Sequence, residues 1–165
     1  MSLVQELQRD ALSSAMPISE LLRKALVVAR KLGVRELADW LGFELKGYPK
    51  GEDVPPYRVI TGRLMAENPV RGWVPVHLDD CSSGVEEALT NRGTLQPVSE
   101  IESVIEQSNL SSSSKSSFSI YMMVPADIQK RFQGDFGWPI ALHTSVSELK
   151  GILDAVRNIV LEWSL

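Results

Sequence analysis

Residues 35–58 (RELADWLGFELKGYPKGEDVPPYR) constrain the fold more than any other stretch of this chain. Apolar residues recur at helical spacing in the first half of the stretch. The Gly-Tyr-Pro sequence at 47–49 then ends the helix, because proline lacks an amide proton and restricts the residue before it. Two prolines at 55–56 force an extended entry into a β-branched run. The stretch therefore joins a helical first third to a remainder that mixes strands and helices.

Apolar periodicity predicts two helices before this stretch. The first covers residues 2–14 and starts with a capping box between Ser2 and Gln5. The second has Ser19 as its N-cap and ends at Gly33, a typical C-terminal cap residue. Their inward-facing residues are Leu3, Val4, Leu7, Ala11 and Leu12 in the first helix, and Leu21, Leu22, Ala25, Val28, Ala29 and Leu32 in the second.

The third helix begins at Val34 and is apolar on two sides. One stripe consists of Val34, Leu37, Ala38, Leu41, Leu45 and Tyr48. At about 100° per residue, Trp40 and Phe43 point to nearly the opposite side. A helix of this kind is usually sandwiched between layers. We therefore expect the first two helices on one side of it and the strand layer or a partner on the other.

The remainder of the chain mixes strands and helices. Strands are predicted over residues 57–65, 72–78, 118–124 and 138–146, and helices over 83–90, 99–107, 125–132 and 147–165. Pro75 favours an edge strand or a bulge. Ser99 and Glu102 form a second capping box, and Asp154 can pair with Arg157 one turn later.

These elements predict an α+β fold in one domain spanning residues 1–165. An N-terminal three-helix unit, about 1–48, packs against a small mixed or antiparallel sheet within residues 57–146, and a long C-terminal helix covers about 147–165. The final helix continues to Leu165 without a stop signal. We therefore expect a longer protein with a possible downstream domain.

Composition and charge argue against several functions. A net charge of −4 argues against a nucleic-acid partner, and no apolar run approaches the ~20 residues that span a bilayer. Cys81 is the single cysteine, so the reducing cytoplasm is the expected location. Residues 79–110 are mainly acidic and residues 23–35 are mainly basic. This segregation indicates either two solvated faces or surfaces that steer a partner or a second copy.

No motif in the chain carries recognisable catalytic chemistry. His77, Asp79, Asp80 and Cys81 crowd together, but their spacing matches no metal signature. A nucleophilic pair of Cys81 with His143 would depend on the fold alone, and a strand end followed by a polar turn is the simpler interpretation. We therefore expect no metal and no cofactor.

Glu44 lies between the two faces of the third helix, where it is partly desolvated. A buried carboxylate needs a counter-ion, and Arg58 is the candidate. Two roles remain open for this pair. It either holds the intervening loop shut, or it forms a cleft with Tyr48 and Tyr57 in which Arg58 binds a phosphate or carboxylate and Glu44 acts as a base.

The sequence WLGFELKGY, followed by a short acidic loop and PPYR, resembles the AbiTii-type domain of bacterial abortive-infection proteins. SLVQELQRDAL and SELLRKALVVARKLG look like the opening helices of that family, and SVSELKGILDAVRNIVLEWSL is similar to its closing helix, whereas residues 64–140 match only loosely. The resemblance implies a role in phage defence, in which infected cells stop growing or die. It supplies no established active site. The motif positions it covers are Trp40, Glu44, Leu45, Gly47, Tyr48, Pro56, Tyr57 and Arg58, with a structural or a binding role.

We therefore expect a non-catalytic defence module that acts by self-association, as a homo-oligomer, or by sensing a protein partner or ligand. The alternative is a toxin enzyme in which Glu44 and Arg58 are catalytic and Tyr48 and Tyr57 line the cleft. A third hypothesis, a polyanion bound by the basic face of the second helix, is disfavoured by the negative net charge.

Overall fold

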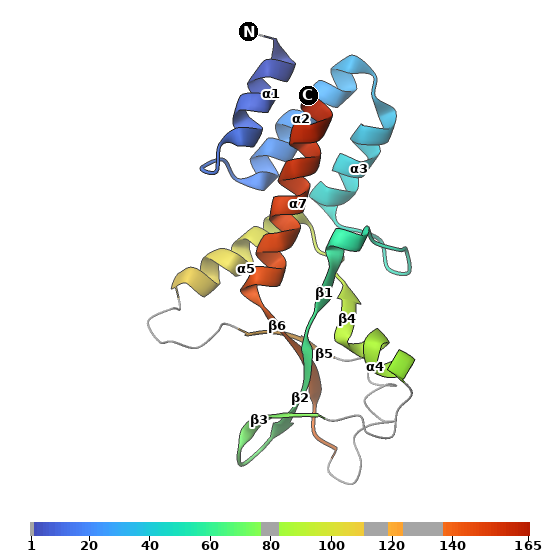
Figure 1. Ribbon diagram of the computed structural model, residues 1–165, viewed down its shortest axis with the longest axis vertical. Coiled ribbons are helices and arrows are strands. Elements are labelled where there is room, and N and C mark those ends of the chain that lie inside the picture. The colour runs from blue at the N-terminus through green and yellow to red at the C-terminus, as the bar shows by residue number, and fades with distance from the viewer. Residues whose placement is uncertain (1, 77–82, 111–118, 124–136) are drawn as a thin grey trace.

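The computed structural model describes residues 2–76, 83–110, 119–123 and 137–165 (Figure 1). The molecule is elongated, with most of its helices at one end and its larger sheet at the other. The helical end contains α1 (Leu3–Leu12), α2 (Ile18–Leu32), α3 (Arg35–Lys46), α5 (Val98–Leu110) and α7 (Val146–Ser164), and α4 (Ser83–Thr90) lies near the sheet. Among the described residues, no helix has the length and apolar content needed to cross a bilayer.

All strand pairs in the two small sheets are antiparallel. β1 (Val59–Thr61) pairs with β4 (Asn91–Gly93). The other sheet has the order β3 (Gly72–Pro75), β2 (Arg63–Asn68), β6 (Ile140–Ser145) and β5 (Ser119–Met123). The α+β class is confirmed, and Pro75 lies in an edge strand as predicted. The predicted helix over residues 125–132 lies outside the described residues.

Two hydrophobic cores hold the described parts together. The larger one is helical and is centred on α2, which packs against α1, α3, α5 and α7. Leu21, Leu22 and Ala25 of α2 are fully buried there. The smaller core lies at the sheet end and contains Leu64, Ala66, Leu89, Ile140 and Leu142.

The predicted strand layer on the second side of α3 is wrong, whereas a partner on that side stays a prediction. Its main packing partners are the helices α2 and α5, and Phe43 remains 38% exposed. The sheet cannot cover α3 because the four-stranded sheet builds a separate core at the far end of the molecule. Leu12 and Leu32, predicted to face inward, are 72% and 58% exposed.

Gly62 divides the predicted strand over residues 57–65. A Cβ atom at this position would lie 2.5 Å from the carbonyl oxygen of His143, so the two chain segments pass too close for any side chain. A short 3-10 turn, Pro56–Arg58, replaces the beginning of the predicted strand. Gly62 thereby separates β1, whose Ile60 lies in the helical core, from β2, whose Leu64 lies in the sheet core.

Helix α2 is capped by a residue from a distant helix. The capping box of Ser2 with Gln5 is confirmed at α1, but α2 begins at Ile18 and Ser19 is not its N-cap. Instead, Glu102 of α5 accepts hydrogen bonds from the amide of Ile18 at 2.5 Å and, more weakly, from that of Ser19 at 3.4 Å. A carboxylate is favourable at the positive end of the helix dipole. The predicted box between Ser99 and Glu102 is wrong, because α5 starts at Val98 and Glu102 serves α2.

Candidate functional site

The structure brings Glu44 and Arg58 together as a buried ion pair. Glu44 lies in the last turn of α3, and the 3-10 turn after the proline pair presents Arg58. One terminal nitrogen of Arg58 contacts Glu44 Oε2, and Arg58 Nε donates to Glu44 Oε1 at 3.3 Å. Both side chains are 0% exposed. Arg58 is therefore the counter-ion predicted for Glu44, although Glu44 is fully buried rather than partly desolvated.

Three further residues of the predicted site are linked to the Glu44 carboxylate by hydrogen bonds, two of them directly and one through Tyr57. The hydroxyl groups of Tyr48 and Tyr57 donate to Glu44 Oε1 at 2.8 Å and 2.7 Å. The indole N–H of Trp40 donates to the hydroxyl oxygen of Tyr57 at 2.8 Å. All five side chains thus belong to one hydrogen-bond network, which we call the Glu44 network (Trp40, Glu44, Tyr48, Tyr57 and Arg58).

Arg58 also ties this network to the loop that leads into α5. Its Nη1 atom donates to the carbonyl oxygens of Thr94 at 3.3 Å and of Gln96 at 2.5 Å. Its guanidinium carbon lies 5.0 Å from the centre of the Tyr48 ring, a favourable cation–π position. Sequence reasoning missed Thr94 and Gln96, because a backbone carbonyl acceptor leaves no side-chain signature.

Gly47 allows the same loop to approach the end of α3. It has a positive φ of 91°, and a Cβ atom here would lie 2.8 Å from the carbonyl oxygen of Leu95. The amide of Tyr48 donates to that oxygen at 2.9 Å. The close approach therefore depends on a glycine immediately before Tyr48.

The two tyrosines remain protonated donors at neutral pH. Burial, followed by the hydrogen bond to Glu44, raises the pKa of Tyr48 above its ordinary value. The same two causes raise the pKa of Tyr57 to about 12. Both shifts move the hydroxyl groups away from the range in which a general acid or base exchanges protons near neutral pH.

The second cluster considered from the sequence is only partly described. His77, Asp79, Asp80 and Cys81 lie outside the described residues, so the structure does not place a Cys81–His143 pair. The His143 ring packs edge-on against Trp73, with 4.7 Å between ring centres, and burial lowers its pKa. Within the described ranges, no group of three or more His, Cys, Asp and Glu residues has a metal-binding arrangement.

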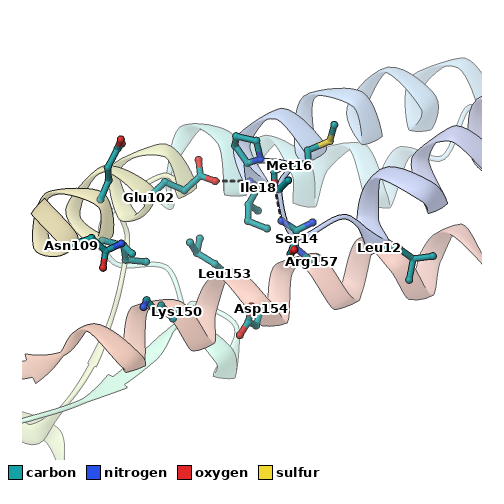
Figure 2. A pocket seen from close by; sticks show the side chains of 14 residues that line it. Leu12, Ser14, Met16, Ile18, Glu102, Asn109, Lys150, Leu153, Asp154 and Arg157 are labelled. Carbon is teal, nitrogen blue, oxygen red and sulfur yellow. Dashed lines mark hydrogen bonds between the residues drawn. The ribbon is translucent and has the colours of Figure 1, made fainter.

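An open groove of about 800 Å³ lies between α5, α7 and the turn that joins α1 to α2 (Figure 2). Its walls carry the exposed charged residues Glu106, Lys150 and Asp154. The apolar residue Leu12, which is 72% exposed, also lines the groove. This groove could not be predicted from the sequence, because its residues come from three separate segments.

Two charged residues of the groove have internal partners. Arg157 does not pair with Asp154 as predicted. It donates to the carbonyl oxygens of Ser13 at 2.7 Å and Met16 at 2.5 Å, which stabilises the turn after α1. Figure 2 shows the contact between Arg157 and Met16 and the one between Ile18 and Glu102.

The fold and the buried network define a small α+β protein whose strongest polar contacts fasten a loop to a helical bundle. The sequence model of the AbiTii family matches residues 2–165, and the chain belongs to this family. No curated protein matches the chain, and no solved structure does. The resemblance of the opening, central and closing segments to AbiTii-type domains is thus confirmed over essentially the whole sequence.

Proposed function

We propose that this chain is a non-catalytic interaction module in abortive infection, acting by self-association or by binding a protein partner. Its membership in the AbiTii family suggests the context of defence against phage. The observation that carries the proposal is the complete burial of Glu44 and Arg58. Glu44 and Arg58 are therefore assigned a structural role, and the groove is assigned the role of recognition.

The groove has the chemical character of a protein interface. Such interfaces combine an apolar centre with a polar rim. Here Ile105 and Leu153 provide apolar surface inside the groove, and Glu106, Lys150 and Asp154 provide charge around it. The volume of about 800 Å³ and the open shape suit a side-chain cluster of a partner.

A charged residue at the rim tests this role. We expect Leu12→Glu to prevent assembly and to abolish protection against phage, because it replaces the exposed apolar side chain of the groove by a charged one. Leu32→Glu is the matched control, since Leu32 is a similarly exposed apolar residue, 58% against 72%, outside the groove. Light scattering after size-exclusion chromatography measures the assembly, and phage plating measures protection. A protective wild-type chain that remains a strict monomer without a bound protein at tens of micromolar would contradict the proposal.

The competing proposal is a toxin enzyme with Glu44 as base and Arg58 as anion-binding group. The meeting of Glu44, Tyr48, Tyr57 and Arg58 at one place favours it, but a substrate could reach the pair only after the structure opened. Glu44→Gln separates the two proposals. Loss of toxicity at an unchanged melting temperature would favour chemistry, whereas a lower melting temperature would favour a structural ion pair.

A further inference from the structure

A hollow of about 230 Å³ lies between α1 and α2 and shares no lining residue with the groove. Leu7 and Val28 line it and are buried, whereas Leu3 and Val27 line it and are exposed, Val27 to 52%. Glu6 of α1 also lines it. A cavity of about 150 Å³ holds a benzene-sized group. The hollow is therefore an apolar depression in the surface with room for the side chain of a large apolar residue.

Exposed cations flank Val27 along α2. Arg23 lies one helical turn before Val27 and Lys31 one turn after it, and both are exposed. Within the described ranges, neither forms an ion pair. Asp10, which also lines the hollow, is already paired with Lys24 at 2.7 Å. Together, α1 and α2 carry five basic and three acidic residues, so the face around the hollow has a net positive charge.

Helix α5 has the complementary combination of charge and apolar surface. Its charged residues are Glu100, Glu102 and Glu106, and it contains no basic residue. Glu106 is exposed and forms no ion pair with a described residue. Leu110, one turn beyond Glu106, is 81% exposed. Among the described residues, Leu110 is the one large, exposed apolar side chain on an element whose charges are all acidic.

The spacing of charged and apolar residues agrees between the two surfaces. Glu106 and Leu110 are four residues apart, which is about 6 Å along a helix. Arg23 and Lys31 lie at the same distance on either side of Val27. A leucine beside Val27 therefore brings Glu106 close to a cation whichever way the two helices run. Opposite charges placed in this way fix the register of two partners and speed their encounter.

We propose that the hollow between α1 and α2 binds the end of α5 from a second copy of this chain. Leu110 of one copy enters the hollow beside Val27 of the next, and Glu106 pairs with a cation of α2. The inference rests on the self-association included in the proposed function, and Glu106 is also part of the groove. The end of α5 lies apart from α1 and α2 within one chain (Figure 1). Because the two surfaces differ, the contact links copies into a ring or an open chain.

Two blocked variants of the intact chain test this contact. Leu110→Glu removes the α5 side, and Val27→Glu removes the side formed by α1 and α2. Each variant keeps one working surface. We expect each variant alone to be monomeric in light scattering after size-exclusion chromatography, and an equimolar mixture to form a 1:1 complex that grows no further. A contact that used the same surface in both copies could not give this result.

A charge reversal tests the ion pair separately. Glu106→Lys should prevent assembly because it faces Arg23 and Lys31, and adding Arg23→Glu and Lys31→Glu to the same chain should restore assembly. Val70→Glu is the matched control, since Val70 is 90% exposed in the turn between β2 and β3, outside both surfaces. It should assemble like the wild type. All substituted side chains are exposed, so we expect unchanged melting temperatures.

The outcomes separate this contact from the role of the groove. A mixture of Leu110→Glu and Val27→Glu that stays monomeric, or a Leu110→Glu chain that assembles like the wild type, would overturn the contact. If Leu12→Glu alone prevented assembly, the contact would be wrong and the groove would keep its proposed role. A monomeric wild type that binds another protein through the groove would have the same meaning. A monomeric wild type without any protein partner would contradict both proposals.

Discussion

Replacing Arg58 tests whether the Glu44 network holds the fold together. Arg58→Met keeps much of the side-chain volume and leaves the carboxylate of Glu44 without a counter-ion at 0% exposure. The carbonyl oxygens of Thr94 and Gln96 also lose their shared donor. Breaking a buried ion pair by removing one partner costs about 3–5 kcal/mol. This is a large share of a typical unfolding free energy of about 5–15 kcal/mol.

The double variant Glu44→Leu/Arg58→Met completes the test. Replacing both members of a buried pair by apolar residues is often close to neutral. The hydroxyl groups of Tyr48 and Tyr57 then lack their acceptor, so we expect the double variant to be less stable than wild type and more stable than Arg58→Met. The single and double variants should show a coupling energy of about 2–3 kcal/mol.

Urea unfolding followed by circular dichroism measures these free energies, and a thermal scan provides a second readout. A loss of about 3–5 kcal/mol corresponds to a melting temperature roughly 6–20 °C lower for a chain of this length. Arg58→Met within about 1 kcal/mol of wild type, or a coupling energy near zero, would refute the reasoning. The loop before α5 would then be held by other contacts.

Three further predictions concern features outside the ion pair. Glu102→Ala should lower the unfolding free energy by about 1 kcal/mol through loss of the α2 cap, whereas Glu106→Ala, one turn later and exposed, should change it little in the same urea assay. Gly62→Ala should destabilise by about 1–3 kcal/mol because its Cβ meets a carbonyl oxygen at 2.5 Å, whereas Gly151→Ala in open space on α7 should stabilise by up to about 1 kcal/mol; equal effects on the melting temperature would contradict this. Tyr57 should ionise near pH 12 in the folded chain, because its pKa is raised to about 12 from an ordinary 10.0, so its contribution to stability is present below pH 10 and is lost between pH 10 and 12. Absorbance at alkaline pH measures the ionisation, and a native tyrosine spectrum titrating wholly near pH 10 would contradict it.

Contacts within one stretch of chain could be predicted from the sequence. The pairing of Glu44 with Arg58 follows from a carboxylate on a helix edge and a basic residue just beyond a proline turn. The Ser2–Gln5 capping box and the left-handed Gly33 are likewise local signals, and the structure confirms both.

Contacts between distant segments could not be predicted in this way. Glu102 caps a helix that begins 84 positions earlier, and Arg157 reaches a carbonyl group 144 positions away. For each residue, a local partner in its own helix was the more obvious choice. Only the packing of α5 and α7 beside the α1–α2 turn decides between the local and the distant contact.

The alternation of the chain between its two cores has a consequence for biosynthesis. The helical core takes Leu21 from α2, Ile101 from α5 and Ile152 from α7, whereas β2 and β6, which lie between these helices in the sequence, contribute to the sheet core. The helical core is therefore not one continuous segment, and it cannot close before α7 has been synthesised. The first three helices leave the exit tunnel before α5 and α7, which cover part of their apolar faces, have been synthesised. Until then, the nascent chain exposes apolar surface that favours aggregation unless a chaperone covers it.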